Sequence, residues 1–561
     1  MMSHTKPRAL CRSFIAGWWV LLVAIPALGW SADAVTIVVH TDQVVHPEFR
    51  GVGFHASWPL HTTTREHFEQ VLGKRWRELD PKFARVTHSW AKGQPGVSDP
   101  KALEALAERL NFMKQDTATE VYLTTMGPGS APAGPERDTY ASTVVSDLEY
   151  LIHSGATNVK YYCFTNELSI KEWADLKDDL PTFRDYQQRI YNELQRRHVD
   201  VKLLATDASP VRYWNTEEWA AENMDDITGV YGGHHYLETD DPADMNFYSW
   251  FLGRCAWASD LARKKGKNFI LGEFGSRQYF DKKYGYRWDT CLHYGTPREP
   301  MAALQVAEAA LAAINGGVYA MGYWTFTDYP EWSDEPYINQ WGVFKWATNG
   351  SETRAPYYSY GLLTKFFGGP ATVFRVEAPD PKLRVAAIRH NDRNTWSIAV
   401  INRSLEPVKI ELRLDGAPVS ADFRKYVYDP ASVPKTEDGD LQEPAGKVAV
   451  RQGQLEDTVG PNQLALYTTR YDDEPPAPVK GLKVAGMEDA RRLTWEANSE
   501  PDLCYYRIFH NGSRIGSTIA TEFDDTGPDR FKPGEYEVVA VDQSGNGSQP
   551  GAAKAPTRER R

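Results

Sequence analysis

Short apolar segments rich in β-branched and aromatic residues alternate with longer segments of helical periodicity along most of the chain. Eight short segments fit strands: 51–55, 83–88, 120–126, 158–167, 201–209, 226–236, 267–275 and 316–326. Segments such as 99–116 and 298–317 carry apolar residues three or four positions apart, as helices do. Asp99 is a candidate N-cap, and Gly316 and Gly317 can end a helix. Eight strand–helix repeats predict a (β/α)8 TIM barrel, an α/β fold.

The pattern changes after residue 370. Short alternating runs such as "TWSIAVINRS" and "VKIELRLDG", separated by Asp, Asn and Gly turns, predict a β-sandwich over 371–471. An acidic, Pro-rich stretch at 472–481 fits a linker. Residues 482–555 again predict short strands, and with Trp495 early and Tyr536 late they resemble a fibronectin type III module. The barrel is therefore expected over 33–370, followed by two β-rich domains.

The first 32 residues have the pattern of a secretory signal peptide. Lys6, Arg8 and Arg12 precede an apolar run, and small residues follow it near Ala32. We expect cleavage there and export to the medium, the periplasm or the cell surface. An uncleaved membrane anchor is the alternative. No later segment is long and apolar enough to span a bilayer.

The four cysteines beyond residue 32 are too few for a disulfide framework in a chain of 561 residues. Cys255 and Cys291 are a candidate disulfide, and Cys163 is expected to be a buried small apolar residue. The fourth is Cys504. No CxxC or HExxH spacing occurs, so no metal site is suggested.

Charge and aromatic content narrow the classes of partner. The net charge of −12 is spread along the chain without a Lys/Arg block, which argues against nucleic acid as a partner. Aromatic residues make up 12% of the chain, with 18 Trp and 29 Tyr. Their flat apolar faces and polar edges suit sugars, although most aromatic residues in any protein are core.

Two glutamates end apolar strands. Glu167 ends the fourth predicted strand and Glu273 the seventh. The carboxyl ends of barrel strands form the active site, and strands four and seven lie across its mouth. Two facing carboxyls are the groups that glycoside hydrolysis requires. Their repulsion and partial burial are expected to raise the pKa of one and leave the other low.

The Asn166–Glu167 pair and Glu273 resemble the clan A glycoside hydrolases, the 4/7 superfamily. Within that clan, 322–346 and 353–368 resemble family 39, the β-xylosidases and α-L-iduronidases, which also carry a β-sandwich after the barrel. Residue 168 is Leu where that family usually has Pro.

The resemblance implies a role for each matching residue. Glu167 would be the general acid/base and Glu273 the nucleophile, while Asn166 would bind the sugar 2-hydroxyl. Further positions in the pattern are Arg85 beside the nucleophile, the cluster His234, His235 and Tyr236, and Trp324 under the sugar. His55 and Trp90, after the first two strands, are candidate sugar contacts. One of the two adjacent histidines is expected to be structural.

Each of these residues also has a structural interpretation. Asn166 could cap the next helix, and Arg85 could pair with a structural carboxylate. Trp324 could fill the barrel interior. Asp207 and Asp328 also follow strands and could bind a hydroxyl, but they rank below the glutamates.

The sequence therefore predicts an exported, retaining glycoside hydrolase that acts on an oligo- or polysaccharide and needs no metal or organic cofactor. One alternative is an endo-acting exopolysaccharide hydrolase or transglycosylase, with the long aromatic loop 276–299 walling a pocket or extending a groove. The other is a non-catalytic carbohydrate-binding surface protein. The sugar and the oligomeric state stay open.

Overall fold

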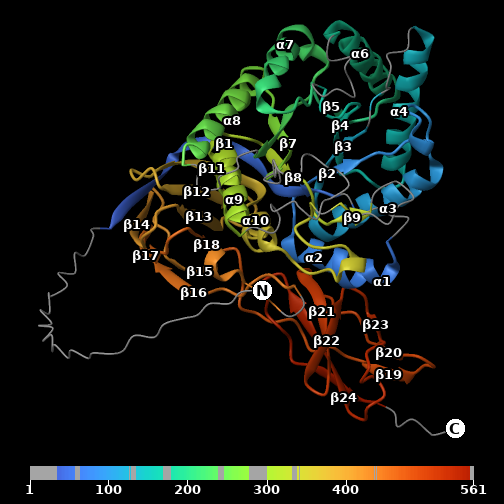
Figure 1. The fold of residues 1–561 in the computed structure, drawn as a ribbon, viewed down its shortest axis with the longest axis vertical. Coiled ribbons are helices and arrows are strands. Elements are labelled where there is room, and N and C mark those ends of the chain that lie inside the picture. Colours follow the sequence, from blue (N-terminus) through green and yellow to red (C-terminus); the bar gives the residue numbers. More distant parts are fainter. Residues whose placement is uncertain are drawn as a thin grey trace, which may run out of the picture. The chain divides into compact units, whose positions relative to one another are not determined.

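Eight parallel strands form a closed ring. They are β1 (Val35–His55), β2 (Phe83–Thr87), β3 (Glu120–Thr124), β4 (Val159–Cys163), β5 (Lys202–Leu203), β6 (Tyr231–Leu237), β7 (Phe269–Ser276) and β8 (Ala320–Tyr323). Neighbouring strands pair in parallel, and β8 pairs with the end of β1. Between β5 and β6 the ring is completed by the bridges Leu204–Val230 and Ala208–Gly233. This is the barrel that the eight apolar segments predict (Figure 1).

This computed structural model describes residues 34–56, 58, 63–125, 127, 134–168, 179–237, 245–276, 300–330, 338–339, 341–434, 436 and 439–555. The predicted signal peptide, Cys291 and residues 277–299 of the aromatic loop lie outside them.

Several strands are shorter than the sequence pattern indicates, among them the eighth, which spans Ala320–Tyr323 and not 316–326, and two that are followed by a carboxylate. The fifth was expected over 201–209, but only two residues form β5, and Asp207 has a left-handed φ of 52° that ends the extended run. The fourth was expected to reach Glu167, but β4 ends at Cys163 and Glu167 has a φ of 51°. In both places the backbone turns where a carboxylate enters the mouth of the barrel.

Helices follow the strands as the apolar periodicity predicts. The longer ones are α3 (Pro100–Thr117), α4 (Pro135–His153), α6 (Leu180–Arg197), α8 (Phe247–Lys264), α9 (Pro300–Asn315) and α10 (Ala355–Phe366), with α2 (Gly73–Leu79) and α7 (Asn215–Asn223) shorter. Asp99 caps α3 by accepting hydrogen bonds from the backbone N–H of Lys101 and Ala102. The chain leaves α9 through Gly317, whose φ is +79°.

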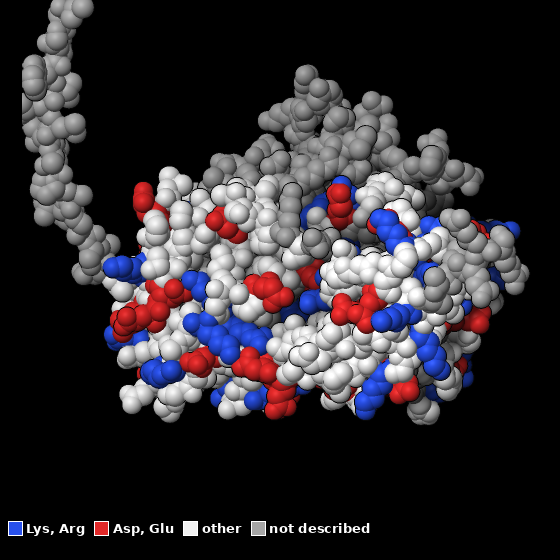
Figure 2. Space-filling model, turned by 90° about the horizontal axis from the view of Figure 1, so that it is seen from below, with Lys and Arg blue, Asp and Glu red and all other residues white. Residues whose placement is uncertain are grey.

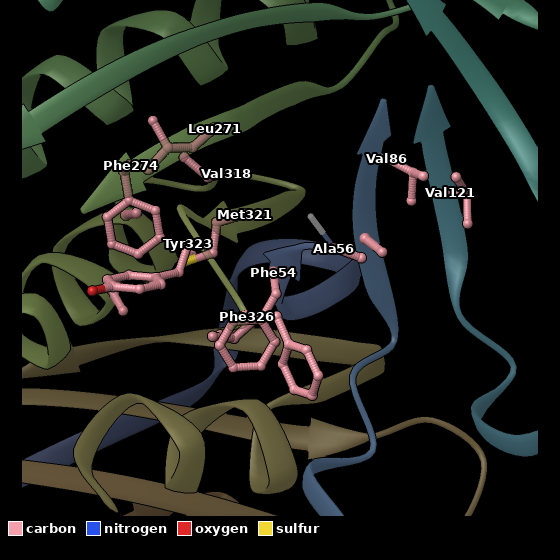
Figure 3. Packing of buried hydrophobic residues seen from close by; sticks show 14 of the residues in the cluster. Phe54, Ala56, Val86, Val121, Leu271, Phe274, Val318, Met321, Tyr323 and Phe326 are labelled. Carbon is pink, nitrogen blue, oxygen red and sulfur yellow. The ribbon is translucent and has the colours of Figure 1, made fainter. Parts of the chain in front are cut away.

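The strands are buried on both faces. The interior cluster consists of Phe83, Tyr122, Tyr161, Cys163, Leu204, Val230, Ile270, Tyr319 and Ala320. The outer face packs against the helices, and Figure 3 shows the rings of Phe54 and Phe326 together, with centroids 5.3 Å apart. Cys163 is thus a buried small residue, as expected, and burial raises the pKa of its thiol to about 12.

Cys255 is a free thiol. It is buried on α8, where its Cβ lies close to Gly316 at the end of α9. Its candidate disulfide partner, Cys291, lies outside the described residues.

β1 belongs to two units. Its first part pairs antiparallel with β11 (Gly368–Glu377) and, from Val35 to His40, parallel with β14 (Val408–Asp415). Its last part, from Gly51, is a barrel strand. The other strands after the barrel are β12 (Leu383–His390), β13 (Trp396–Asn402), β15 (Ala421–Tyr428), β16 (Gly446–Val450), β17 (Gln454–Val459) and β18 (Gln463–Thr468). The range 33–370 assigned to the barrel thus contains a strand of the β-rich region that follows it (Figure 1).

The C-terminal module has two sheets. One contains β19 (Lys483–Gly486), β20 (Arg491–Thr494) and β23 (Glu522–Asp525). The other contains β21 (Leu503–His510), β22 (Ser513–Thr518), β24 (Glu535–Asp542) and β25 (Gly551–Lys554). Trp495 and Tyr536 lie in the apolar cluster of this module, together with Tyr506.

Asp440, which lies shortly before β16, links the module to the barrel helix α2 through buried charges. Lys74 of α2, only 1% exposed, donates to Asp440, and Arg514 of β22 donates to the other carboxylate oxygen of Asp440 at 2.7 Å. The backbone N–H of Ile519 donates to Glu69 O at 3.0 Å, and Gln543 Nε2 to Arg77 O at 2.7 Å. The module is therefore attached to the barrel by specific polar contacts.

Lys and Arg side chains are interspersed with Asp and Glu on the face of the molecule seen in Figure 2. Within the described ranges, no helix combines the length and the apolarity that crossing a bilayer requires.

Replacing Asp440 by alanine should destabilise the whole chain. The carboxylate is 5% exposed and neutralises two largely buried cations, and breaking such a pair from one side typically costs about 3–5 kcal/mol. Thermal unfolding of Asp440→Ala tests this. The matched control is Asp422→Ala, whose pair with Arg451 is more than half exposed and is worth at most about 1 kcal/mol. Equal melting temperatures in the two variants would contradict the attachment.

Candidate active site

Arg85 lies at the centre of the barrel mouth. Side chains of β2 alternate, so Phe83 and Arg85 face the interior while Ala84 and Val86 pack outward. The guanidinium is 1% exposed, and its Nη1 donates to Glu273 Oε2 at 2.8 Å. Although burial acts to lower it, the pKa of Arg85 is raised by the negative charge of Glu273. Arg85 therefore pairs with a carboxylate, and that carboxylate is the predicted nucleophile.

Glu273 reaches the interior through an irregularity in β7. The pairing between β7 and β8 shifts register between Leu271 and Phe274, so two consecutive residues occupy one position. Leu271 and Phe274 both pack in the outer cluster, which leaves Gly272 and Glu273 facing the mouth. A Cβ at Gly272 would lie 3.0 Å from Tyr122 Cε1 and 3.2 Å from His234 Nε2, so a side chain there would crowd both rings.

Glu273 receives two donors. Arg85 binds Oε2, and the phenol of Tyr236 donates to Oε1. Burial raises the pKa of Glu273 above its ordinary value, while the charges of His234 and Arg85 act in the opposite direction. The carboxylate is thus fixed in orientation, with both oxygens held.

Glu167 and His234 contact one another across the mouth. His234 Nδ1 lies 3.1 Å from Glu167 Oε1, and its Nε2 lies 3.0 Å from Asp207 Oδ1. Burial alone would lower the pKa of His234, but the charges of Asp207 and Glu273 raise it to about 9. His234 is therefore an imidazolium at neutral pH, with a carboxylate oxygen within 3.1 Å of each ring nitrogen.

The two glutamates come within reach of each other. Carboxylate oxygens of Glu167 and Glu273 and a ring nitrogen of His234 lie within 4.8 Å of one another. All three side chains are largely buried, with Glu167 6% and Glu273 5% exposed.

The histidine that sequence reasoning expected to be structural is His235. Its ring lies 5.3 Å from that of Trp250 and 5.5 Å from that of Phe251 on α8. Successive residues of β6 face opposite sides, so His234 and Tyr236 point inward and His235 outward.

Asn166 binds the same guanidinium. Its Oδ1 accepts a hydrogen bond from Arg85 Nη2, so that oxygen does not cap a helix. This contact uses the amide oxygen and not the amide Nδ2, which is a hydrogen-bond donor.

Asp207 and Asp328 have different surroundings. Asp207 is fully buried beside His234, and the interactions of His234 and Arg85 hold its pKa below the ordinary value against the effect of burial. Asp328 instead pairs with Arg354 through two contacts of 2.7 and 2.6 Å and accepts from the backbone N–H of Gly342. Asp207 thus contributes to the site, whereas Asp328 fixes the segment after β8.

The predicted aromatic contacts line a cavity of about 890 Å³. Trp324 is partly exposed and packs on His55, with ring centroids 4.3 Å apart, so it does not fill the barrel interior. Trp90 is 6% exposed and also lines the cavity, beside His88. His55 Nδ1 lies 3.2 Å from Arg85 Nη1, so the cavity adjoins the carboxylate pair.

Sequence reasoning missed Tyr122 and Arg109. Tyr122 lies below Arg85, with the guanidinium 5.5 Å from its ring, and Arg109 lines the cavity from α3. Strand alternation in "EVYLTTM" places Tyr122 inward and could have indicated it. Arg109 has no such signal, because it occupies one position of a helix rich in charged residues.

The oxygens and nitrogen of Glu167, His234 and Glu273 could in principle hold a metal ion. The protonated ring of His234 opposes metal binding, because an imidazolium has no lone pair to offer. Glu273 is in addition already bound by Arg85. Asp472, Asp502 and Asp542 form a second acidic group, in which Asp472 accepts hydrogen bonds from Ser544 and Asn546, and Asp542 accepts one from Asn546.

The pH dependence of stability should reflect His234. Because its pKa is raised from 6.5 to about 9, its contribution is complete below pH 6.5 and is lost as the pH rises through about 9. We expect the melting temperature to fall more steeply between pH 7 and 10 in the wild type than in His234→Gln. The ring signals of His234 in NMR should titrate near pH 9, and titration near 6.5 would contradict the assignment.

No protein-family model matches the chain, and a search of curated proteins found no relative. Solved structures with a similar fold do exist. A glycoside hydrolase family 30 subfamily 8 xylanase from Clostridium acetobutylicum is 14% identical with a TM-score of 0.53, over 77% of this chain and 99% of that one. An α-L-arabinofuranosidase from Thermotoga maritima is 13% identical with a TM-score of 0.56, over 78% and 100%.

A bacterial orthologue of human α-L-iduronidase matches over more of the chain. It is 15% identical with a TM-score of 0.55 and covers 93% of this chain and 99% of that one. At such identities the similarity establishes the fold. The fold implied by the resemblance to the clan A glycoside hydrolases is thereby confirmed.

Proposed function

We propose that this protein is a retaining glycoside hydrolase in which Glu273 is the nucleophile and Glu167 the general acid/base. The observation that carries the proposal is the spacing of the two carboxylates, whose oxygens lie within 4.8 Å. Retaining enzymes hold this pair about 5–5.5 Å apart, whereas inverting enzymes need about 6.5–9.5 Å to admit a water molecule.

The charges of the site support the same assignment. Arg85 and His234 supply two positive charges, and Glu167, Glu273 and Asp207 can supply three negative ones. A buried cluster is most stable when neutral, so one carboxyl retains a proton. Glu273 has a guanidinium at 2.8 Å and a phenol on its second oxygen, and both oppose the rise in its pKa that burial causes. The proton is therefore assigned to Glu167.

The reaction then proceeds in two steps. Glu273 Oε attacks the anomeric carbon, the bond to the leaving oxygen breaks, and Glu167 gives that oxygen its proton. A water molecule next attacks the glycosyl-enzyme bond and returns a proton to Glu167. Asn166 Nδ2 is placed to bind the 2-hydroxyl, and Trp324 to support the sugar ring. The substrate is an oligo- or polysaccharide, and the basic, apolar N-terminal segment supports export.

Endo action is the second candidate. The cavity continues from Trp324 past Trp90 to the start of α3, and about 890 Å³ holds more than one sugar unit. Product lengths from a long glycan distinguish the modes, since endo cleavage yields intermediate oligosaccharides early and exo cleavage yields only the terminal unit.

Glu273→Ala and Glu167→Gln should each lower turnover by orders of magnitude on a glycan that the wild type cleaves, because each removes one of the two catalytic groups. Hydrolysis of aryl glycosides and polysaccharides is the measurement, and circular dichroism checks the fold. Asp422→Asn, on an exposed part of the β-rich region, is the control and should retain full activity.

Azide should restore activity to Glu273→Ala and give a glycosyl azide of inverted configuration, because a small anion can replace the missing nucleophile. NMR of the first wild-type product should show the anomer of the substrate. Near-wild-type activity in both glutamate variants, or an inverted first product, would contradict the mechanism. Glycan binding without product release would favour the non-catalytic alternative.

A further inference from the structure

Arg109 is a buried cation without a carboxylate partner. It is 8% exposed, and within the part of the chain that the structure describes no Asp or Glu oxygen lies within 4.0 Å of its guanidinium. Its Nη1 donates to Ala56 O at 3.2 Å and its Nη2 to Trp58 O, while its Nε has no hydrogen-bond partner. Burial lowers the pKa of Arg109 to about 9.

Other buried arginines of this protein have the carboxylate partner that Arg109 lacks among the described residues. Arg85, Arg354 and Arg384 each have a carboxylate oxygen within 2.8 Å. Removing a cation from water costs several kcal/mol, and two neutral carbonyls compensate only part of it. A guanidinium kept in this state is complementary to a negative group that arrives from outside the chain.

Arg109 lines the cavity beside Glu167 and Glu273. The cavity lined by His55 and Trp324 is also lined by Arg109, Lys92 and Lys101. Both lysines are exposed, and neither has a carboxylate oxygen within 4.0 Å among the described residues. Lys92 has a left-handed φ of 49°, which an L-residue adopts only at a cost in free energy.

Negative charge is scarce on this wall. Asp99 is the one acidic residue among the described residues that line the cavity, and its Oδ1 already accepts two hydrogen bonds from the start of α3. The cavity thus carries an excess of positive charge in a chain whose net charge is −12. A concave wall of one sign concentrates ligands of the opposite sign.

We propose that this cavity is a subsite for an acidic sugar, adjacent to the sugar that Glu167 and Glu273 act on. The negative group, a carboxylate or a sulfate ester on the glycan, would contact the ammonium groups of Lys92 and Lys101, with the charge of Arg109 acting behind them. Trp90 and Tyr329 offer apolar faces to the ring. The inference rests on the proposed function, to which it adds the substrate class.

The test compares matched acidic and neutral glycans. One pair is a uronic acid-containing oligosaccharide and the same oligosaccharide with its carboxyls reduced to alcohols. The other is a sulfated oligosaccharide and its desulfated form. Wild-type protein should prefer the acidic member of at least one pair by about 10-fold in kcat/KM, and the preference should fall with added salt. Preference in the first pair alone indicates a carboxylate, and in the second alone a sulfate.

The double variant Lys92→Gln/Lys101→Gln should lower that preference about 10-fold, since it removes both exposed charges. Lys409→Gln is the matched control, an exposed lysine on β14 outside the cavity, and it should keep the wild-type preference. Arg109→Met should lower the preference as well, and its melting temperature shows whether it folds.

Binding by calorimetry to Glu273→Ala separates this inference from the proposed function. If acidic glycans bind more tightly than their neutral counterparts and the lysine variant loses the difference, the subsite is supported even where no product forms. Equal affinity and equal kcat/KM for acidic and neutral members in both pairs would overturn it, and cleavage of neutral glycans would then leave the glycosidase assignment intact.

Discussion

The guanidinium of Arg85 is the constraint around which the mouth of the barrel is built. From β2 it contacts groups on four other strands or the loops after them, including His55, Thr124, Asn166 and Glu273. A guanidinium is planar and its N–H directions are fixed, so each of these partners is held in angle as well as in distance. One buried cation therefore holds Glu273 and the residue before Glu167 in place.

Around that cation the charges nearly cancel. His234 is charged because Asp207 lies on one side of it and the glutamates on the other. Asp207 is charged because His234 and Arg85 lie beside it. The protonation state of each group therefore depends on the others, and the site titrates as a unit. The proposed reaction needs such a unit to pass a proton to a leaving oxygen and to recover it from water.

The barrel and the position of its two mouth glutamates could be predicted from the sequence, because the carboxyl ends of barrel strands share one edge. That rule predicts Glu167 and Glu273 at one mouth, and the resemblance to the clan A glycoside hydrolases adds Arg85. The remainder depends on features with no local pattern. The irregularity at Gly272 and the left-handed backbone at Asp207 turn carboxylates inward, yet each is a departure from alternation. Arg109 has the sequence context of an ordinary helix surface, and only tertiary packing shows that none of the described carboxylates lies beside it.

Because β1 pairs both in the barrel and in the β-rich region, its partners are made at different times during synthesis. When Val35 leaves the ribosome, its partner Ile410 has not been translated, and the barrel partner of Gly51, Ala320, is also still to come. The backbone groups of β1 that pair with β8 and β14 therefore stay unpaired with these strands while much of the polypeptide is made. Although β1 can pair early with β2, neither the barrel nor the β-rich region can be completed before β8 and β14 have been made.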